Sequence, residues 1–255
     1  MARPVVKATG QGLHRLRSWL EDEPVRYAAV IHLLSAPVDE VHIWVDNNRR
    51  PRAVLAIRPD PGSLVAAADP PETIRDLVHV LPSGEYRLRS VDVELVPHLE
   101  SGLTAAMGTP VWLYQMDPEN LRPTRNAETR PVKPSEASMI AALWAPKRDR
   151  SAYVRRRIEE GITSGIEMDG ELVAWDMTHF ETESVVMLGF LHVKEAYRGR
   201  GYAKTVTTAT AEKVFSRGKV AAAEVFEDNQ ASLRLTEGMG FRRVKRQVWG
   251  DVAKA

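Results

Sequence analysis

The sequence predicts an α/β protein made of two domains. At 255 residues, the chain exceeds the ~100–200 residues of a typical domain and suits one large unit or a pair. Apolar runs of strand length alternate with helical patterns in both halves of the sequence. The segment 117–134 between the halves contains four X-Pro pairs and almost no apolar residues, which is typical of a linker. We therefore predict domains at 1–122 and 123–255.

Composition and charge exclude several classes of protein. An apolar content of 44% excludes wholesale disorder, and a net charge of +1 gives no strong electrostatic basis for binding nucleic acid or membranes. No apolar run approaches the ~20 residues of a membrane span. The absence of cysteine excludes a thiolate nucleophile and any Cys-ligated metal. The histidines at 14, 32, 42, 79, 98 and 179 show no metal-ligand spacing, so we predict no metal.

The N-terminal 20 residues have two interpretations. They contain four basic residues and no acidic one, with leucines at helical spacing: Arg3, Lys7, Arg15, Arg17 and Leu13, Leu16, Leu20. This pattern is typical of a mitochondrial presequence, but equally of the first amphipathic helix of a fold. We favour the helix, because Leu20 leads directly into the acidic stop Glu21–Glu23. The predicted location is therefore intracellular and cytoplasmic, with the mitochondrion as the alternative.

The rest of the first half predicts further helices and strands without a catalytic signature. The expected elements are a buried helix at 25–34, a hairpin of strands at 41–45 and 53–57, helices at 70–81 and 98–107, and a strand at 111–116. The helix at 70–81 opens with prolines and an acid, which suit a helix N-terminus.

The second half predicts a longer series of elements. These are a helix ending at Trp144, an Arg-rich helix ending at Gly161, strands at 165–168, 171–175 and 184–193, a helix from Ala203, a strand at 221–226 and a helix at 230–239. Asp169-Gly170 between apolar runs is a strong hairpin signal. We interpret Arg155, Arg156 and Arg157 as a solvated helix face rather than a nucleic-acid patch.

The clearest chemical signal is a glycine-rich turn between the strand 184–193 and the following helix. It contains Arg198, Gly199, Arg200, Gly201, Tyr202 and Ala203. Such a turn leaves backbone N–H groups unpaired at the positive end of a helix, where they bind phosphate oxygens. The glycines let the backbone approach a diphosphate closely, and the arginines add charge.

This turn resembles the acyl-CoA diphosphate signature of the GCN5-related N-acetyltransferase (GNAT) superfamily. The segment from Asn229 to Gly240-Phe241 resembles a second signature of the superfamily, in the right order. Within the superfamily, the chain is most similar to glycine N-acyltransferase-like proteins. The resemblance implies a mixed, mainly antiparallel sheet flanked by helices, with a GNAT fold in the C-terminal half and a degenerate, non-catalytic GNAT-like N-terminal half.

The resemblance also implies a reaction and its cosubstrate. It implies transfer of an acyl group from acetyl-CoA or another acyl-CoA to a small-molecule amine or amino acid such as glycine, by a monomer or homodimer. The alternatives are a protein or peptide N-acetyltransferase and a non-catalytic acyl-CoA-binding module. The implied cosubstrate contacts are the backbone at Leu191 and Val193, the turn 198–203, Asn229 and Ser232. Asn229 has a second interpretation, as the cap of the helix that follows it.

Two positions depart from the family pattern. Met187 occupies the position at which vertebrate glycine acyltransferases have a catalytic Glu. Thr236 occupies the position of the superfamily Tyr that protonates the leaving thiolate. We predict His192 and Glu224 as replacement bases. The ordinary pKa of a histidine, ~6.5, suits proton transfer at neutral pH; the alternative for His192 is a solvent-facing or hydrogen-bonded histidine at a strand end. An acid inside a core strand, such as Glu224, requires a reason, and access to a cleft is one. Glu181 and Glu227 are weaker alternatives, since both fit solvated strand ends.

Overall fold

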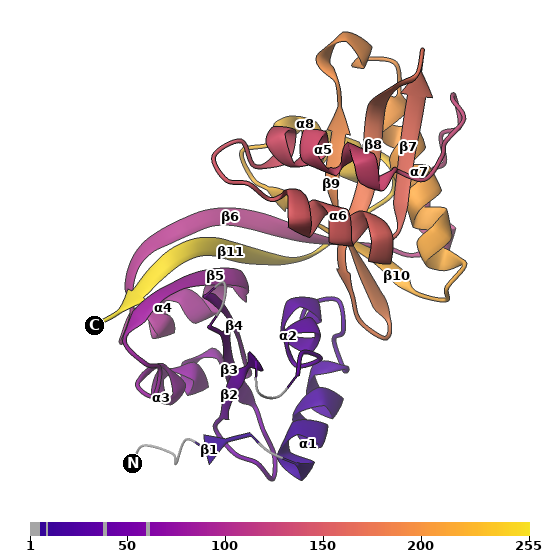
Figure 1. The fold of residues 1–255 in the computed structure, drawn as a ribbon. Helices are drawn as coiled ribbons and strands as arrows, with labels where there is room; N and C mark the ends of the chain where they lie inside the picture. Colours follow the sequence, from indigo (N-terminus) through magenta and orange to yellow (C-terminus); the bar gives the residue numbers. More distant parts are fainter. Residues whose placement is uncertain (1–5, 9, 38–39, 60–61) are drawn as a thin grey trace. The chain divides into compact units, whose positions relative to one another are not determined.

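The chain folds into two compact units (Figure 1). The computed structural model describes residues 6–8, 10–37, 40–59 and 62–255. One unit comprises Met1–Leu113, Phe226–Asp228 and Val244–Ala255, and the other comprises Tyr114–Val225 and Asn229–Arg243. This division differs from a single boundary at residue 122, because the end of the chain returns to the first unit as a strand.

The first unit is a sheet with helices on its faces. Its strands are β1 (Val6–Lys7), β2 (His42–Val45), β3 (Ala53–Arg58), β4 (Ser63–Ala68), β5 (Gly84–Asp92), β6 (Thr104–Met116) and β11 (Arg242–Lys254), in the order β1-β2-β3-β4-β5-β11-β6. Its helices are α1 (Gln11–Leu20), α2 (Ala28–Leu33), α3 (Ile74–Val78) and α4 (Val96–Leu99), with 3-10 turns at Pro71–Thr73 and Val93–Leu95. The parallel pairing of β4 with β5 extends over only two residue pairs, Ser63↔Arg87 and Leu64↔Leu88.

Strand β3 separates the two apolar cores of this unit. Successive side chains of a strand point to opposite faces. Accordingly, Val54 and Ala56 pack with the residues of α1 and α2, whereas Leu55 and Ile57 pack with those of α3 and α4. The basic segment at the N-terminus contains the predicted amphipathic helix, α1, whose Leu16 is fully buried. Of its basic residues, Arg3 lies outside the described residues.

The helix predicted at 98–107 is wrong. Helix α4 ends at Leu99, and the chain from Thr104 onward belongs to strand β6. The Thr104 hydroxyl donates to the carbonyl oxygen of Ala253 at 3.1 Å, and a side chain at Gly108 would collide with the Trp249 carbonyl. The neighbour of β6 is thus the last strand of the chain, which the local sequence does not reveal. The strands β4 and β5 were also not predicted.

The second unit is a four-stranded sheet between two helical layers. Its strands are β7 (Thr163–Met168), β8 (Glu171–Glu181), β9 (Val185–Val193) and β10 (Val220–Phe226), in the order β10-β9-β8-β7. Its helices are α5 (Ala137–Trp144), α6 (Ser151–Glu160), α7 (Tyr202–Phe215) and α8 (Gln230–Gly238), with 3-10 turns at Pro118–Asn120, Pro134–Glu136 and Glu195–Tyr197. Helices α5 and α6 pack on one face of the sheet and α7 on the other (Figure 1).

The proline-rich segment 117–134 is an ordered part of the second unit rather than a free linker. The Arg122 N–H donates to the Met239 carbonyl oxygen at 2.9 Å. Arg130 exchanges two backbone hydrogen bonds with Gly165 on β7, at 2.8 and 2.7 Å. Its guanidinium also pairs with Glu136 and Glu167. Prolines favour an extended chain, which here lies along the unit and is called the strap, residues 120–132.

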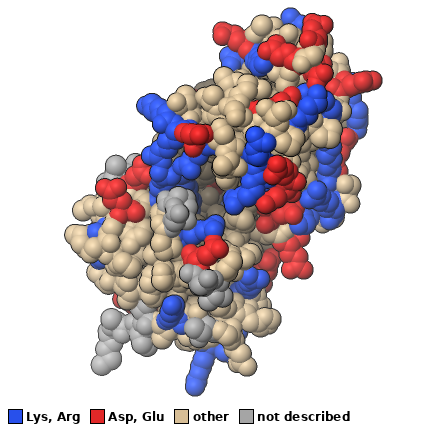
Figure 2. Space-filling model, viewed as in Figure 1, with Lys and Arg blue, Asp and Glu red and all other residues tan. Residues whose placement is uncertain are grey.

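Three further properties of the described residues concern charge, membrane spans and metal ligands. Basic and acidic side chains are interspersed on the face shown in Figure 2, as a net charge of +1 suggests. Among the described residues, no helix has the length and apolarity that a membrane crossing requires. Within the same ranges, no group of three or more His, Asp or Glu side chains is arranged to hold a metal ion.

Candidate active site

Strand β9 loses its neighbour β10 halfway along its length. The parallel pairing ends at Leu188↔Ala223, although β9 continues to Val193. Beyond Leu188, the register between β9 and β8 shifts, and Phe190 adopts a φ of 59°. These are the marks of a β-bulge, which bends a strand. The edge of residues 189–193 that faces β10 therefore has no strand partner among the described residues.

Two backbone donors point to this open edge. The Lys194 N–H donates to the Val173 carbonyl oxygen on β8 at 2.9 Å. Because successive N–H groups of a strand alternate between its two edges, the N–H of His192 also faces β8, and those of Leu191 and Val193 face the open edge. Two N–H groups on one edge can hold a carbonyl oxygen that becomes negatively charged.

The glycine-rich turn lies directly after this strand. Gly199 and Gly201 have φ values of 76° and 77°, a left-handed conformation that favours glycine. Helix α7 begins at Tyr202, is 14 residues long and has no acidic residue in its first turn. Its first N–H groups, including those of Tyr202 and Ala203, have no partner within the helix. The turn therefore has the geometry of an anion site at the positive end of a helix dipole.

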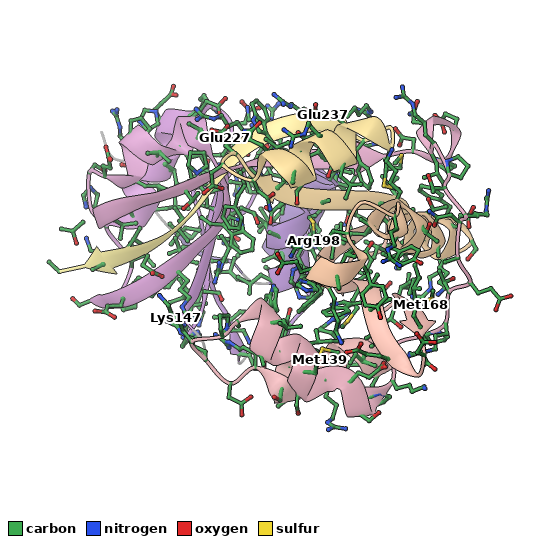
Figure 3. The ribbon with its side chains drawn as sticks, turned by 90° about the horizontal axis from the view of Figure 1, so that it is seen from above. Met139, Lys147, Met168, Arg198, Glu227 and Glu237 are labelled. Atoms are coloured by element: carbon green, nitrogen blue, oxygen red, sulfur yellow. The ribbon has the colours of Figure 1, made fainter. Side chains whose placement is uncertain are left out.

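The two arginines of the turn fold back onto the segment before it. Arg198 donates to the Val193 carbonyl oxygen at 3.2 Å, and Arg200 donates to that of Ala196 at 3.3 Å. Arg200 also lies over the ring of Tyr197. Both guanidinium groups stay exposed, and Arg198 is labelled in Figure 3. Since a guanidinium carries five donors, each arginine keeps donors for an anion at the turn.

His192 lies on the unpaired part of β9, half-buried, with its ring stacked on Trp175 at 4.7 Å. Burial lowers the pKa of His192 below its ordinary value, and the charges of Arg198 and Lys194 lower it further. The imidazole is therefore neutral at pH 7 and able to accept a proton.

Glu224 lies on β10, where its pairing with β9 has just ended. It is the first residue of that strand beyond the paired register, which ends at Ala223, and its side chain is half-buried. The two predicted bases thus lie on the two strands whose pairing has ended.

Asn229 and Ser232 form a helix cap. The Asn229 side-chain oxygen accepts the backbone N–H of Ser232 at 3.1 Å, at the start of α8. The capping interpretation of Asn229 therefore describes its observed contact. Met187 and Thr236, the two departures from the family pattern, are both buried.

An aromatic cluster on the α5/α6 face of the sheet was missed from the sequence. The rings of Trp144, Tyr153 and His179 surround Phe190, at centroid distances of 4.6, 6.0 and 4.2 Å from it. The Tyr153 hydroxyl lies 3.4 Å from Nδ1 of His179. These residues come from two helices and two strands, so no local spacing connects them.

Asp176 is a second group that the sequence analysis passed over. This carboxyl lies on β8 and is only 1% exposed. Burial raises the pKa of Asp176 to about 7, against the opposing effect of the neighbouring Thr207 hydroxyl and Met177 N–H. An acid inside the apolar run Leu172–Met177 was the available signal.

Comparisons with known proteins concern the fold. Residues 160–250 match a protein-family model described as "FR47-like protein". No curated protein sequence matches the chain. A Drosophila protein of known structure aligns over 96% of this chain and 88% of its own, with 16% identity and a TM-score of 0.69.

Two acetyltransferase structures align over nearly the whole chain. An acetyltransferase of the GNAT family from Colwellia psychrerythraea covers 99% of this chain and 100% of its own, with 13% identity and a TM-score of 0.62. A tandem GNAT protein from the clavulanic acid biosynthesis pathway covers 98% of both chains, with 14% identity and a TM-score of 0.58. The chain therefore has the GNAT fold, a mixed α/β fold whose large, mostly antiparallel sheet is flanked by helices.

Proposed function

We propose that the chain is an acyl-CoA-dependent N-acyltransferase. It moves an acetyl or other acyl group from CoA to the amine of a small molecule or an amino acid such as glycine. One observation carries the proposal: the open edge of β9 leads directly into the glycine-rich turn. The turn supplies donors for the diphosphate of CoA, and the N–H groups of Leu191 and Val193 supply donors for the thioester carbonyl.

The side chains on the two faces of the sheet determine from which face an amine approaches. The side chains of Leu191 and Val193 pack with Tyr202 and Val206 of α7, so that face is filled. The ring of His192 lies on the opposite face, against Trp175. An amine therefore approaches from the face that carries His192.

The reaction follows from these positions. The amine nitrogen attacks the thioester carbon, the new C–N bond forms, and the C–S bond breaks. The N–H groups of Leu191 and Val193 stabilise the charge on the carbonyl oxygen, and His192 accepts the amine proton. Water protonates the departing thiolate, since the Thr236 hydroxyl is a poor acid. Because the chain has no cysteine, transfer is direct, without an acyl-thioester of the enzyme.

Glu224, Asn229 and Ser232 complete the proposed site. Glu224 is the second proton acceptor, through its position where β10 leaves β9. Asn229 and Ser232 contact the pantetheine arm of CoA. The Asn229 amide NH2 group carries the donors for this contact, because its oxygen already caps α8.

We assign the chemistry to the C-terminal half, 123–255, and a non-catalytic role to 1–122. In the first unit, the turn that corresponds to the glycine-rich turn lies between β4 and α3, and its sequence is Asp69-Pro70-Pro71-Glu72. Its two prolines have no N–H, and its two carboxylates repel a diphosphate. Helix α3 is also only five residues long. These features oppose phosphate binding in the first unit.

A non-catalytic acyl-CoA-binding module is the second candidate. It is favoured by Met187 and Thr236, which replace the acid–base groups of the family pattern. Such a module would use the same turn and the same open edge without transferring the acyl group.

A two-stage experiment tests these functions. Isothermal titration calorimetry with CoA measures binding, and release of free thiol from acetyl-CoA and longer acyl-CoAs measures transfer. The amine panel contains glycine, glutamine, simple aliphatic and aromatic amines, and a lysine-containing peptide. Binding with turnover of a free amine supports the enzyme, and turnover of the peptide alone would indicate a protein acetyltransferase. Binding without turnover would indicate the module, and absence of CoA binding would refute the proposal.

A further inference from the structure

Asn126 of the strap contacts the glycine-rich turn and the first turn of α7 together. Its side-chain amide donates to the Arg200 carbonyl oxygen at 2.5 Å. Its side-chain oxygen accepts the hydroxyl of Thr205, and its own N–H donates to the same hydroxyl oxygen at 3.5 Å. Thr205 is only 2% exposed. One side chain from outside the turn thus connects the turn to the helix.

This contact fixes the direction of one phosphate-facing group. In a planar trans peptide, the C=O and the N–H point in opposite directions. Because the Arg200 carbonyl points to Asn126, the N–H of Gly201 must point away from the strap. Gly201 lies at the N-cap of α7, where an anion would bind. The orientation of a backbone donor is therefore set by the Asn126 amide.

The same contact gives a second reason, besides the positive φ, for a glycine at position 201. A Cβ at this position would lie 2.5 Å from Nδ2 of Asn126. At the neighbouring Gly199, nothing lies within 4 Å of such a Cβ. The close approach is therefore specific to the residue whose N–H the strap orients.

The strap has further contacts with α7 that do not involve the turn. The Thr124 N–H donates to the Thr208 hydroxyl oxygen at 3.1 Å, and Arg125 forms an exposed ion pair with Glu212. With Thr205, these positions form one face of the helix. The strap should therefore stay in place when the side chain of Asn126 is removed.

We propose that Asn126, supported by Thr205, is a positioning residue for the diphosphate-binding turn. It does not touch the reacting atoms. It holds the Arg200–Gly201 peptide in the orientation that a diphosphate needs before the ligand arrives, which lowers the cost of ordering the turn on binding. This inference rests on the proposed binding of acyl-CoA at the turn.

The test compares ligands with and without the diphosphate in the full chain. Calorimetry measures the dissociation constant for CoA, and ligand-observed NMR measures it for pantetheine, which lacks the diphosphate. We expect Asn126→Ala to weaken CoA binding about tenfold, in line with loss of one oriented hydrogen bond, and to leave pantetheine binding within twofold. Thr205→Val should act in the same direction, whereas Thr205→Ser, which keeps the hydroxyl, should bind CoA like the wild type.

Arg125→Ala is the matched control, because it removes a strap contact that does not reach the turn. It should bind CoA within twofold of the wild type. Thermal unfolding checks that each variant is folded. If Asn126→Ala does not fold, the comparison of Thr205→Val with Thr205→Ser provides the test. Unchanged CoA binding in folded Asn126→Ala or Thr205→Val, equal weakening of CoA and pantetheine, or equal loss in Arg125→Ala would overturn the inference. If the wild type binds pantetheine and CoA equally, the turn does not bind the diphosphate, and the proposed function fails as well.

Discussion

Asp176 gives the sharpest prediction, because its effect depends on the second unit's packing alone. Burial raises the pKa of this carboxyl from 3.8 to about 7. In the native state it therefore keeps its proton up to about pH 7, whereas the unfolded chain releases that proton near pH 4. The unfolded state binds fewer protons in this window, so this group lowers wild-type stability as the pH rises through it. The difference between these two pKa values corresponds to about 4 kcal/mol of stability at pH 8, as an upper limit.

Asp176→Asn removes this titration while keeping the shape of the side chain. The Asn oxygen can still accept the Met177 N–H that the carboxyl accepts. Below about pH 3 the carboxyl is protonated in both states, so variant and wild type differ there only by their hydrogen bonds. From pH 4 to pH 8, the free energy of unfolding of the variant should rise relative to the wild type, by up to about 4 kcal/mol. The titration of His192 and other groups cancels in this difference.

Urea unfolding at several pH values, followed by tryptophan fluorescence, measures this difference. Trp175 precedes Asp176 and is 1% exposed, so it reports on the unit that contains the carboxyl. Asp149→Asn is the control, since hydrogen bonds from Ser151 lower the pKa of that exposed carboxyl. Its difference from the wild type should change in the opposite direction, and only slightly. A flat difference for Asp176→Asn across the range would show that the native carboxyl is ionised, and would refute the reasoning.

The remaining predictions concern the site and the strap. His192→Ala should lower the rate of amine acylation by ~10²–10⁴ and leave the CoA dissociation constant unchanged. In the wild type, the rate should fall only below pH 6.5, because the pKa of His192 is lowered. Glu224→Gln should lower the same rate if it shares the proton transfer; an unchanged rate would remove it from the site. Gly201→Ala should raise the KM for acetyl-CoA with little change in kcat, because alanine is strained at a φ of 77° and meets Asn126. Arg130→Ala should lower the unfolding free energy by about 1–3 kcal/mol in calorimetry, because Glu136 and Glu167 lose the guanidinium and keep their contacts with Lys133.

Local signals predicted the elements around the site well. Asp169-Gly170 forms the expected hairpin turn, with φ values of 51° and 79°. The turn after β9 and the start of α7 were readable because glycines and arginines cluster there. Each of these features is set by residues next to one another in the sequence.

Features formed by residues that are distant in the sequence could not be predicted from it. The prolines of 117–134 indicated an extended segment, but not the surface that it binds, because its partners Thr205, Gly165 and Met239 lie far along the chain. The pairing of β11 with β5 likewise depends on tertiary structure, because the pattern of one strand does not determine which strands lie at its two edges. The proposed role of Asn126 depends on such a contact.

The open edge of β9 depends on contacts between residues that are distant in the sequence. A side chain at Gly189 would collide with the ring of His179, so this glycine lets the two strands approach at the bulge. The next residue, Phe190, holds a positive φ that costs a bulky side chain free energy, and its ring packs on His179 and Trp144. The aromatic cluster thus offsets the strain that bends β9. That bend begins where pairing with β10 ends, at Leu188↔Ala223, and it leaves the N–H groups of Leu191 and Val193 facing an edge that has no strand partner among the described residues. The cluster on one face of the sheet therefore helps to create the edge at which we propose that the thioester binds.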